Sequence, residues 1–160
     1  MARIQVAKTV GDIMNRTPVT VPPGMKIWEL IRRFRDDRPA AVAVVDSAGA
    51  LCGIVTVLDL LRAFRPEGAA SASLPRGFAS RTVETVMRPG VITLEPTDLL
   101  LDALDLLVES RFHALPVVRR YPHGPELVGI LEQGDLLPIL TGERRLAPPP
   151  RAGERSGRPG

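Results

Sequence analysis

The sequence has few of the residues on which disulfide and metal chemistry depend. Its 160 residues include one cysteine, two histidines and 4% aromatic residues. A lone Cys52 cannot form an intramolecular disulfide, and together with His113 and His123 it makes no zinc-type ligand cluster. We therefore expect no metal site, and the single thiol suits a reducing, cytoplasmic setting.

Long apolar runs and catalytic signatures are also missing. No stretch approaches the roughly 18 uncharged apolar residues that a membrane-spanning helix needs, and charges and a glycine interrupt residues 1–14 where a secretory signal would need an apolar run. The sequence has no P-loop, no GxGxxG motif and no Ser/His/Asp or Cys/His constellation within plausible reach. These absences predict a cytoplasmic protein that has no membrane contact and is not an enzyme.

The excess of positive charge is confined to the C-terminal end. The chain has 21 Lys and Arg against 18 Asp and Glu, but residues 143–160 hold five Arg and two Glu, which leaves 16 of each sign elsewhere. The remainder is neutral, so net charge gives no argument for nucleic-acid binding. Residues 143–160 are rich in Pro and Gly and are predicted to be a disordered tail, whose deletion should leave the melting temperature nearly unchanged.

An internal repeat organises the rest of the chain. A shift of 73 residues superposes Thr9, Val10, Met14, Thr20, Pro23, Arg38, Ala41, Val44 and Val45 on Thr82, Val83, Met87, Thr93, Pro96, Arg111, Ala114, Val117 and Val118. With three extra residues in the second copy, the match resumes from Leu51, Gly53, Ile54, Asp59, Leu60 and Leu61 to Leu127, Gly129, Ile130, Asp135, Leu136 and Leu137. The insertion lies where residues 46–50 of the first copy become residues 119–126 of the second, and both stretches are rich in turn formers, as expected of a hairpin loop.

Hydrophobic periodicity predicts the order strand, helix, strand, strand, helix in each copy. The expected elements are 19–21, 25–34, 41–45, 51–55 and 57–64 in the first copy, and 91–94, 98–109, 114–118, 126–131 and 134–140 in the second. We expect an α+β protein with a first repeat at 1–65, an exposed Gly/Pro/Ser-rich linker at 66–80 and a second repeat at 81–142.

The helix expected at 98–109 has more apolar surface than one sheet face covers. Its polar residues form one narrow stripe, and the remainder of the helix is Leu, Ala or Val. The stripe consists of Asp98, Asp102, Asp105 and Glu109. The matching helix of the first repeat can cover this apolar surface either completely or in part. In the second case another subunit covers the rest, and a homodimer is the assembly that we expect.

Thr56 and Asp59 form the sharpest local motif, in GIVTVLD at a strand-to-helix junction. Their spacing is that of a capping box, which needs no ligand. A hydroxyl and a carboxylate at a helix start, next to Gly53, also suit the paired hydroxyls of a ribose. In the second copy Glu132 replaces the threonine while Asp135 keeps the acid, so capping alone explains Asp135 less well. Both interpretations remain open from the residues alone.

Two such repeats, each with a Gly followed by two apolar residues and a downstream Asp, and with HALPVV in the second hairpin, resemble a tandem cystathionine β-synthase (CBS) domain pair, or Bateman module. The resemblance covers about residues 9–140. It implies two βαββα repeats that pack through their sheets with pseudo-twofold symmetry. It also implies clefts that bind an adenine nucleotide (AMP, ADP or ATP) or S-adenosylmethionine as a ligand rather than as a required cofactor.

The resemblance also implies roles for individual residues. Asp59 with Thr56, and Asp135 as the second acid, match the ribose-binding positions, and His113 matches a phosphate-contacting position. The implied adenine-pocket residues are Val19, Thr20 and Val21 in one copy and Ile92 and Thr93 in the other. Ala114 stands where many nucleotide-binding relatives carry Arg, so phosphate binding is either weak or depends on Arg38, Arg111, Arg16 or Arg88. Glu132 adds negative charge to the second site, which favours one competent site at Thr56 and Asp59 with His113 reaching across.

Two functions follow from these observations. The first is a homodimeric, non-catalytic sensor that binds an adenine nucleotide between its repeats and acts in trans on a protein effector. The second is a ligand-free dimerisation and docking module in which Thr56 and Asp59 only cap a helix.

Overall fold

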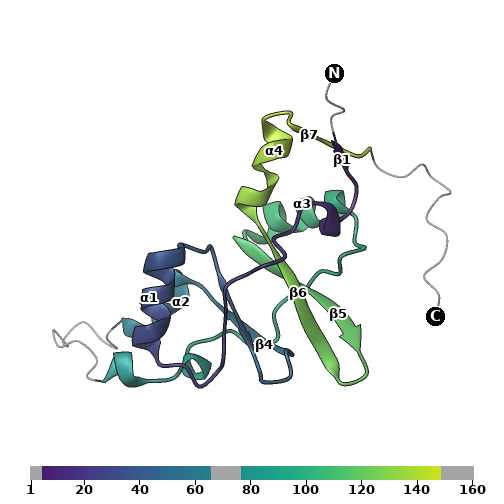
Figure 1. Ribbon diagram of the computed structural model, residues 1–160. Helices are drawn as coiled ribbons and strands as arrows, with labels where there is room; N and C mark the ends of the chain where they lie inside the picture. The colour runs from purple at the N-terminus through teal and green to yellow at the C-terminus, as the bar shows by residue number, and fades with distance from the viewer. Residues whose placement is uncertain (1–4, 66–76, 149–160) are drawn as a thin grey trace.

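The computed structural model describes residues 5–65 and 77–148, and the repeat organises them into two lobes (Figure 1). The first repeat contains β2 (Thr20–Val21), α1 (Ile27–Asp37), β3 (Val42–Val45), β4 (Leu51–Val55) and α2 (Val57–Phe64). The second contains α3 (Leu100–Ser110), β5 (Ala114–Tyr121), β6 (Gly124–Glu132), the 3-10 turn η4 (Gln133–Leu136) and α4 (Leu137–Leu140). The α+β fold of two related repeats is confirmed.

The strands follow the β-branched runs of each hairpin. In the first lobe β2 pairs in parallel with β3, and β3 pairs antiparallel with β4. In the second lobe β5 pairs antiparallel with β6, but the strand expected at 91–94 is reduced to one parallel bridge between Leu94 and Val117. The expectation of a full strand there was wrong, because only Leu94 joins the ladder.

Each long helix ends in the same unusual way. The residues that follow α1 and α3 are Arg38 and Arg111, and both adopt the left-handed conformation, with φ of 49° and 57°. Left-handed caps of this kind are usually glycine. Because the two arginines are aligned by the repeat, both chain reversals lead in the same way into the strands β3 and β5.

The two repeats exchange their leading segments. Residues before β2 pack on the second lobe, where the Val10 amide donates to the Asp98 carbonyl at 2.9 Å and the Leu100 amide donates to Lys8 at 2.9 Å. Residues 77–88 pack on the first lobe in the same way, with the Val83 amide donating to Met25 at 2.9 Å. Figure 1 shows the purple N-terminal segment beside α3 before the chain crosses to the α1 lobe.

Each of the two main hydrophobic cores contains residues from both repeats. One core joins α1, β3 and β4 to Phe78, Val83 and Val86, and the other joins α3, β5 and β6 to Ala7, Val10 and Met14. Between the lobes lies a small third cluster that consists of Ala41, Ile54, Ala114 and Ile130. The two alanines let the sheets approach and the two isoleucines fill the contact, as the predicted packing through the sheets requires.

Two domain boundaries need correction. Phe78 was expected in an exposed linker ending at residue 80, but it is buried, begins the 3-10 turn η2 (Phe78–Ser80) and packs edge-to-face on Phe64. The tail predicted from 143 begins with a strand instead, since β7 (Arg144–Leu146) pairs in parallel with β1 (Gln5–Ala7). Linker residues 66–76 and tail residues 149–160 lie outside the described part.

No helix among the described residues is long and apolar enough to cross a membrane.

Candidate functional site

A cavity of about 560 Å³ lies where the two repeats meet, and its lining comes from both of them. The first repeat contributes Ala40, the end of β4 and the first two turns of α2. The second contributes residues 88–92, which follow the exchanged segment, and residues 110–116, which join α3 to β5. A volume of this size is within the range of about 300–1,000 Å³ that small-molecule sites occupy.

Thr56 and Asp59 lie at one side of this cavity, at the N-terminus of α2. The Thr56 amide and hydroxyl donate to Asp59 Oδ2 at 2.8 and 2.7 Å, and the Asp59 amide donates to Thr56 Oγ1 at 3.3 Å. The capping box expected from the sequence is therefore formed. It does not exhaust the carboxylate, because a carboxylate has about four lone-pair sites and Oδ2 uses two of them.

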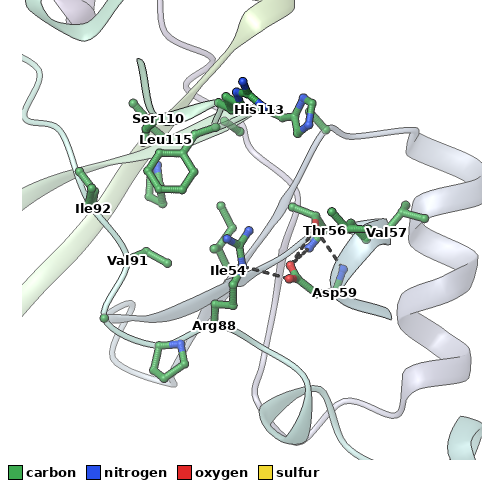
Figure 2. A pocket seen from close by; sticks show the side chains of 18 of the residues that line it. Ile54, Thr56, Val57, Asp59, Arg88, Val91, Ile92, Ser110, His113 and Leu115 are labelled. Carbon is green, nitrogen blue, oxygen red and sulfur yellow. Dashed lines mark hydrogen bonds and ion pairs between the residues drawn. The ribbon is translucent and has the colours of Figure 1, made fainter. Parts of the chain in front are cut away.

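Arg88 pairs with the other oxygen of the same carboxylate. Its Nε lies 3.0 Å from Asp59 Oδ1, in an ion pair between the second repeat's leading segment and α2. Asp59 is 6% exposed, whereas the Arg88 side chain is 43% exposed. The pair therefore leaves much of the guanidinium accessible while it holds the carboxylate in place (Figure 2).

The cavity combines apolar walls with positive charge. Ile54, Val91, Ile92 and Leu115 supply apolar surface. Among the described lining residues, Arg62, Arg88 and Arg111 carry positive charge and Asp59 is the only carboxylate. Figure 2 shows Ile92 and Ser110 on the wall away from Thr56 and Asp59. Apolar walls with a few placed polar groups are typical of small-molecule binding sites, and the arginines favour an anionic ligand.

The residues singled out from the sequence divide between this cavity and the rest of the protein. Thr56, Asp59, Ile92, Arg111 and His113 line the cavity together. The others do not line it. Val21 is buried in the first core and Val19 packs against that core, whereas Thr20 and Arg38 are exposed. Thr93 follows Ile92 and is half-buried, and Asp135 lies in η4. No group of three or more potential metal ligands occurs within residues 5–65 and 77–148.

Arg88 is the lining residue that sequence reasoning undervalued. It was one of four arginines considered for phosphate contacts, yet it alone pairs with Asp59. Arg88 directly follows Met87, and the repeat aligns it with Asn15. The change from asparagine in the first copy to arginine in the second is the sequence feature that distinguishes Arg88.

Comparisons with known proteins agree with this architecture. A family model described as the CBS domain matches residues 10–66 and 83–142. The protein MJ1404 of Methanocaldococcus jannaschii is 27% identical over 151 residues, which cover 88% of this chain and 35% of MJ1404. The chain thus spans about a third of the length of that relative.

Two solved structures resemble the fold. The structure of CBSX2 in complex with AMP has a TM-score of 0.67 at 24% identity, covering 84% of this chain and 97% of CBSX2. The cytosolic domain of the Mg²⁺ channel MgtE in complex with ATP has a TM-score of 0.61 at 26% identity, covering 82% of this chain and 48% of that one. Since the family model matches both repeats over nearly their whole length, the chain belongs to the CBS domain family and carries two of its domains in tandem.

Proposed function

We propose that this chain is a regulatory module that binds an adenine nucleotide or S-adenosylmethionine in the cavity between its two CBS repeats. The observation that carries the proposal is the convergence of Thr56, Asp59 and Arg88 with apolar walls in one inter-repeat cavity. The adenine-nucleotide complexes of CBSX2 and MgtE support this ligand class.

The lining provides a place for each part of such a ligand. The apolar side chains of Val91 and Ile92 suit the adenine ring, because burying its faces removes apolar surface from water. The one acceptor site that the cap and Arg88 leave on Asp59 Oδ1 suits a ribose hydroxyl. Arg88, Arg111 and His113 suit the phosphates, since arginine pairs with phosphate oxygens through charge-assisted hydrogen bonds.

A ligand held there contacts both repeats and so reports on their relative positions. It shifts the balance between two shapes of the module only by its differential affinity for them. The ion pair of Asp59 with Arg88 lies within the first lobe, where residues 77–88 pack, so a ligand that contacts Asp59 and residues 110–116 together joins the two lobes. We propose that this change is passed in trans to a protein effector, in the cytoplasm and without catalysis.

The matched substitutions Asp59→Asn and Asp135→Asn test the ligand assignment. Calorimetric titration with AMP, ADP, ATP and S-adenosylmethionine should show binding of at least one of them to the wild type, with the nucleotide recovered unhydrolysed. Asp59→Asn should weaken that binding more than tenfold, because a hydrogen bond to a charged group contributes about 1.5–3 kcal/mol. Asp135→Asn, the same change at the aligned position outside the cavity, should leave affinity unchanged.

The alternative is a ligand-free docking module, and the complete capping box at Thr56 favours it because that box is satisfied by the protein alone. In that case none of the four ligands binds the wild type, and Asp59→Asn lowers only the melting temperature. Titrations are run below the melting temperature of each variant, so that lost binding is not confused with unfolding.

We further propose that the module forms a homodimer through its helical faces. Trp28 on α1 and Leu61 on α2 are 48% and 59% exposed, and Val108 on α3 and Leu140 on α4 are 72% and 78% exposed. The two faces occupy equivalent places in the repeats, so a second copy can present a matching apolar surface to them. Sedimentation equilibrium should give twice the monomer mass at micromolar concentration. A monomer mass would contradict the proposal.

A further inference from the structure

The two repeats are not equivalent as halves of a binding site, and the difference lies in aligned residues. The repeat superposes Thr56 on Glu132, Asn15 on Arg88 and Ala40 on His113. We infer that the chain's own Glu132 closes the cleft that corresponds to the Asp59 cavity, so that each chain holds one nucleotide. The inference rests on the proposed function and specifies the number of nucleotides that each chain binds.

The first argument is the reach of the side chain at the aligned position. In the Asp59 cavity the Thr56 hydroxyl turns back to its own helix, 2.7 Å from Asp59, and both Thr56 and His113 line the open space. In the other half, Glu132 Oε1 accepts a hydrogen bond from the Ala40 amide of the first repeat at 3.3 Å. Glu132 thus bridges the repeats at the place that corresponds to the open space between Thr56 and His113.

The second argument is charge. The Asp59 cavity has Arg88 and His113, whereas the aligned positions hold the neutral Asn15 and Ala40. The other half carries two carboxyl groups instead. Burial, and then the charge of the neighbouring Asp135, raise the pKa of Glu132, so the two carboxyl groups already repel each other. A phosphate brought there meets negative charge without the aligned cation that Asp59 has.

The stoichiometry of the wild type and of the two aspartate variants tests the inference. Titration with AMP should give one site per chain, which Asp59→Asn abolishes and Asp135→Asn preserves. Two sites in the wild type, or one site lost in Asp135→Asn, would overturn the inference while leaving nucleotide binding intact. No AMP, ADP, ATP or S-adenosylmethionine binding to the wild type would instead reject the proposed function.

The substitution Glu132→Thr tests the closing side chain directly. Adenosine is the probe, because it has no phosphate and does not need the cations that the second half lacks. Glu132→Thr should bind two adenosines per chain in equilibrium dialysis, where the wild type binds one. Glu126→Thr, the same change elsewhere on β6, should stay at one. A folded Glu132→Thr protein that still binds one adenosine would show that Glu132 does not close the cleft.

Discussion

At the residue scale, two glycines permit the exchange of segments between the repeats. Gly53 lies on β4 and Gly129 on β6, and the repeat aligns them. A Cβ at Gly53 would lie 2.7 Å from the Arg88 carbonyl oxygen, and one at Gly129 would lie 2.8 Å from the Asn15 carbonyl oxygen. Backbone oxygens cannot move aside as a flexible side chain can, so only glycine lets the exchanged segments pair with these strands.

Gly53→Ala should therefore destabilise the protein by about 1–3 kcal/mol, the usual cost of overpacking. The change should also weaken ligand binding, because Arg88 would move away from Asp59. Gly24→Ala is the matched control, since an added Cβ there meets nothing within 4 Å. Urea unfolding measures the difference, and equal midpoints for the two variants would show that the close approach at Gly53 carries no energetic cost.

Asp12 gives the protein a pH-dependent contribution to stability. Hydrogen bonds from the Thr9 and Lys8 amides, at 2.9 and 2.8 Å, lower the pKa of Asp12 below its ordinary value of 3.8. A lowered pKa stabilises the folded state above the ordinary value, and this contribution disappears as pH falls through the folded-state pKa.

Asp12→Asn should thus lower the melting temperature near pH 7. The difference from the wild type should shrink below pH 3.8. Thermal melts from neutral pH down through 3.8 and as far below it as the fold persists measure this difference. A gap between variant and wild type that stays constant over that range would mean that the carboxylate charge does not contribute.

At the element scale, β7 changes what a truncation is expected to do. The strand pairs Gln5, Val6 and Ala7 with Arg144, Arg145 and Leu146, and the Ala147 amide donates to the Ala7 carbonyl at 3.0 Å. Leu146 also packs against the core that contains Ala7. This strand fastens the exchanged N-terminal segment to the second lobe.

A chain ending at 142 should be less stable than a chain ending at 148, by about 1–2 kcal/mol for the lost burial of Leu146 and its ladder. This replaces the expectation from sequence that removing residues 143–160 has almost no effect. Urea unfolding of the two truncated chains compares them directly. Identical stability would restore the original expectation and assign β7 no energetic role.

The elements that sequence predicted best are those whose signals are local. β4 and α2 were predicted at 51–55 and 57–64, because an apolar, partly β-branched run is followed at once by the Thr56 cap. β7 was not predicted, because its residues pair with a segment at the other end of the chain and are surrounded by Pro and Gly. The composition of a segment indicates how much apolar surface the segment can bury by itself. It does not indicate whether a distant strand pairs with it.

The candidate site divides in the same way. Thr56 and Asp59 emerge from spacing within one turn of helix, and the family resemblance adds Ile92, Arg111 and His113. The ion pair of Asp59 with Arg88 was not foreseen, because it depends on residues 77–88 packing on the other repeat. Their proximity has no local signature in the sequence.

At the scale of the whole molecule, the exchange of segments makes each lobe depend on both halves of the sequence. The core around α1 includes Phe78, Val83 and Val86, and the core around α3 includes Ala7, Val10 and Met14. Neither repeat contains all the side chains of its own core. The repeats are thus units of sequence, whereas the unit of stability is the pair.

The exchange also sets an order of events during synthesis on the ribosome. While the first repeat emerges, its core lacks the residues from Phe78 onward, and the segment around Val10 has no surface on which to pack. That segment must wait until β6 and β7 have left the exit tunnel. Contacts that span so much of the chain are typical of slow folding. The nascent protein therefore exposes apolar surface until the second repeat has been translated, and we expect chaperones that act at the ribosome to bind it in that interval.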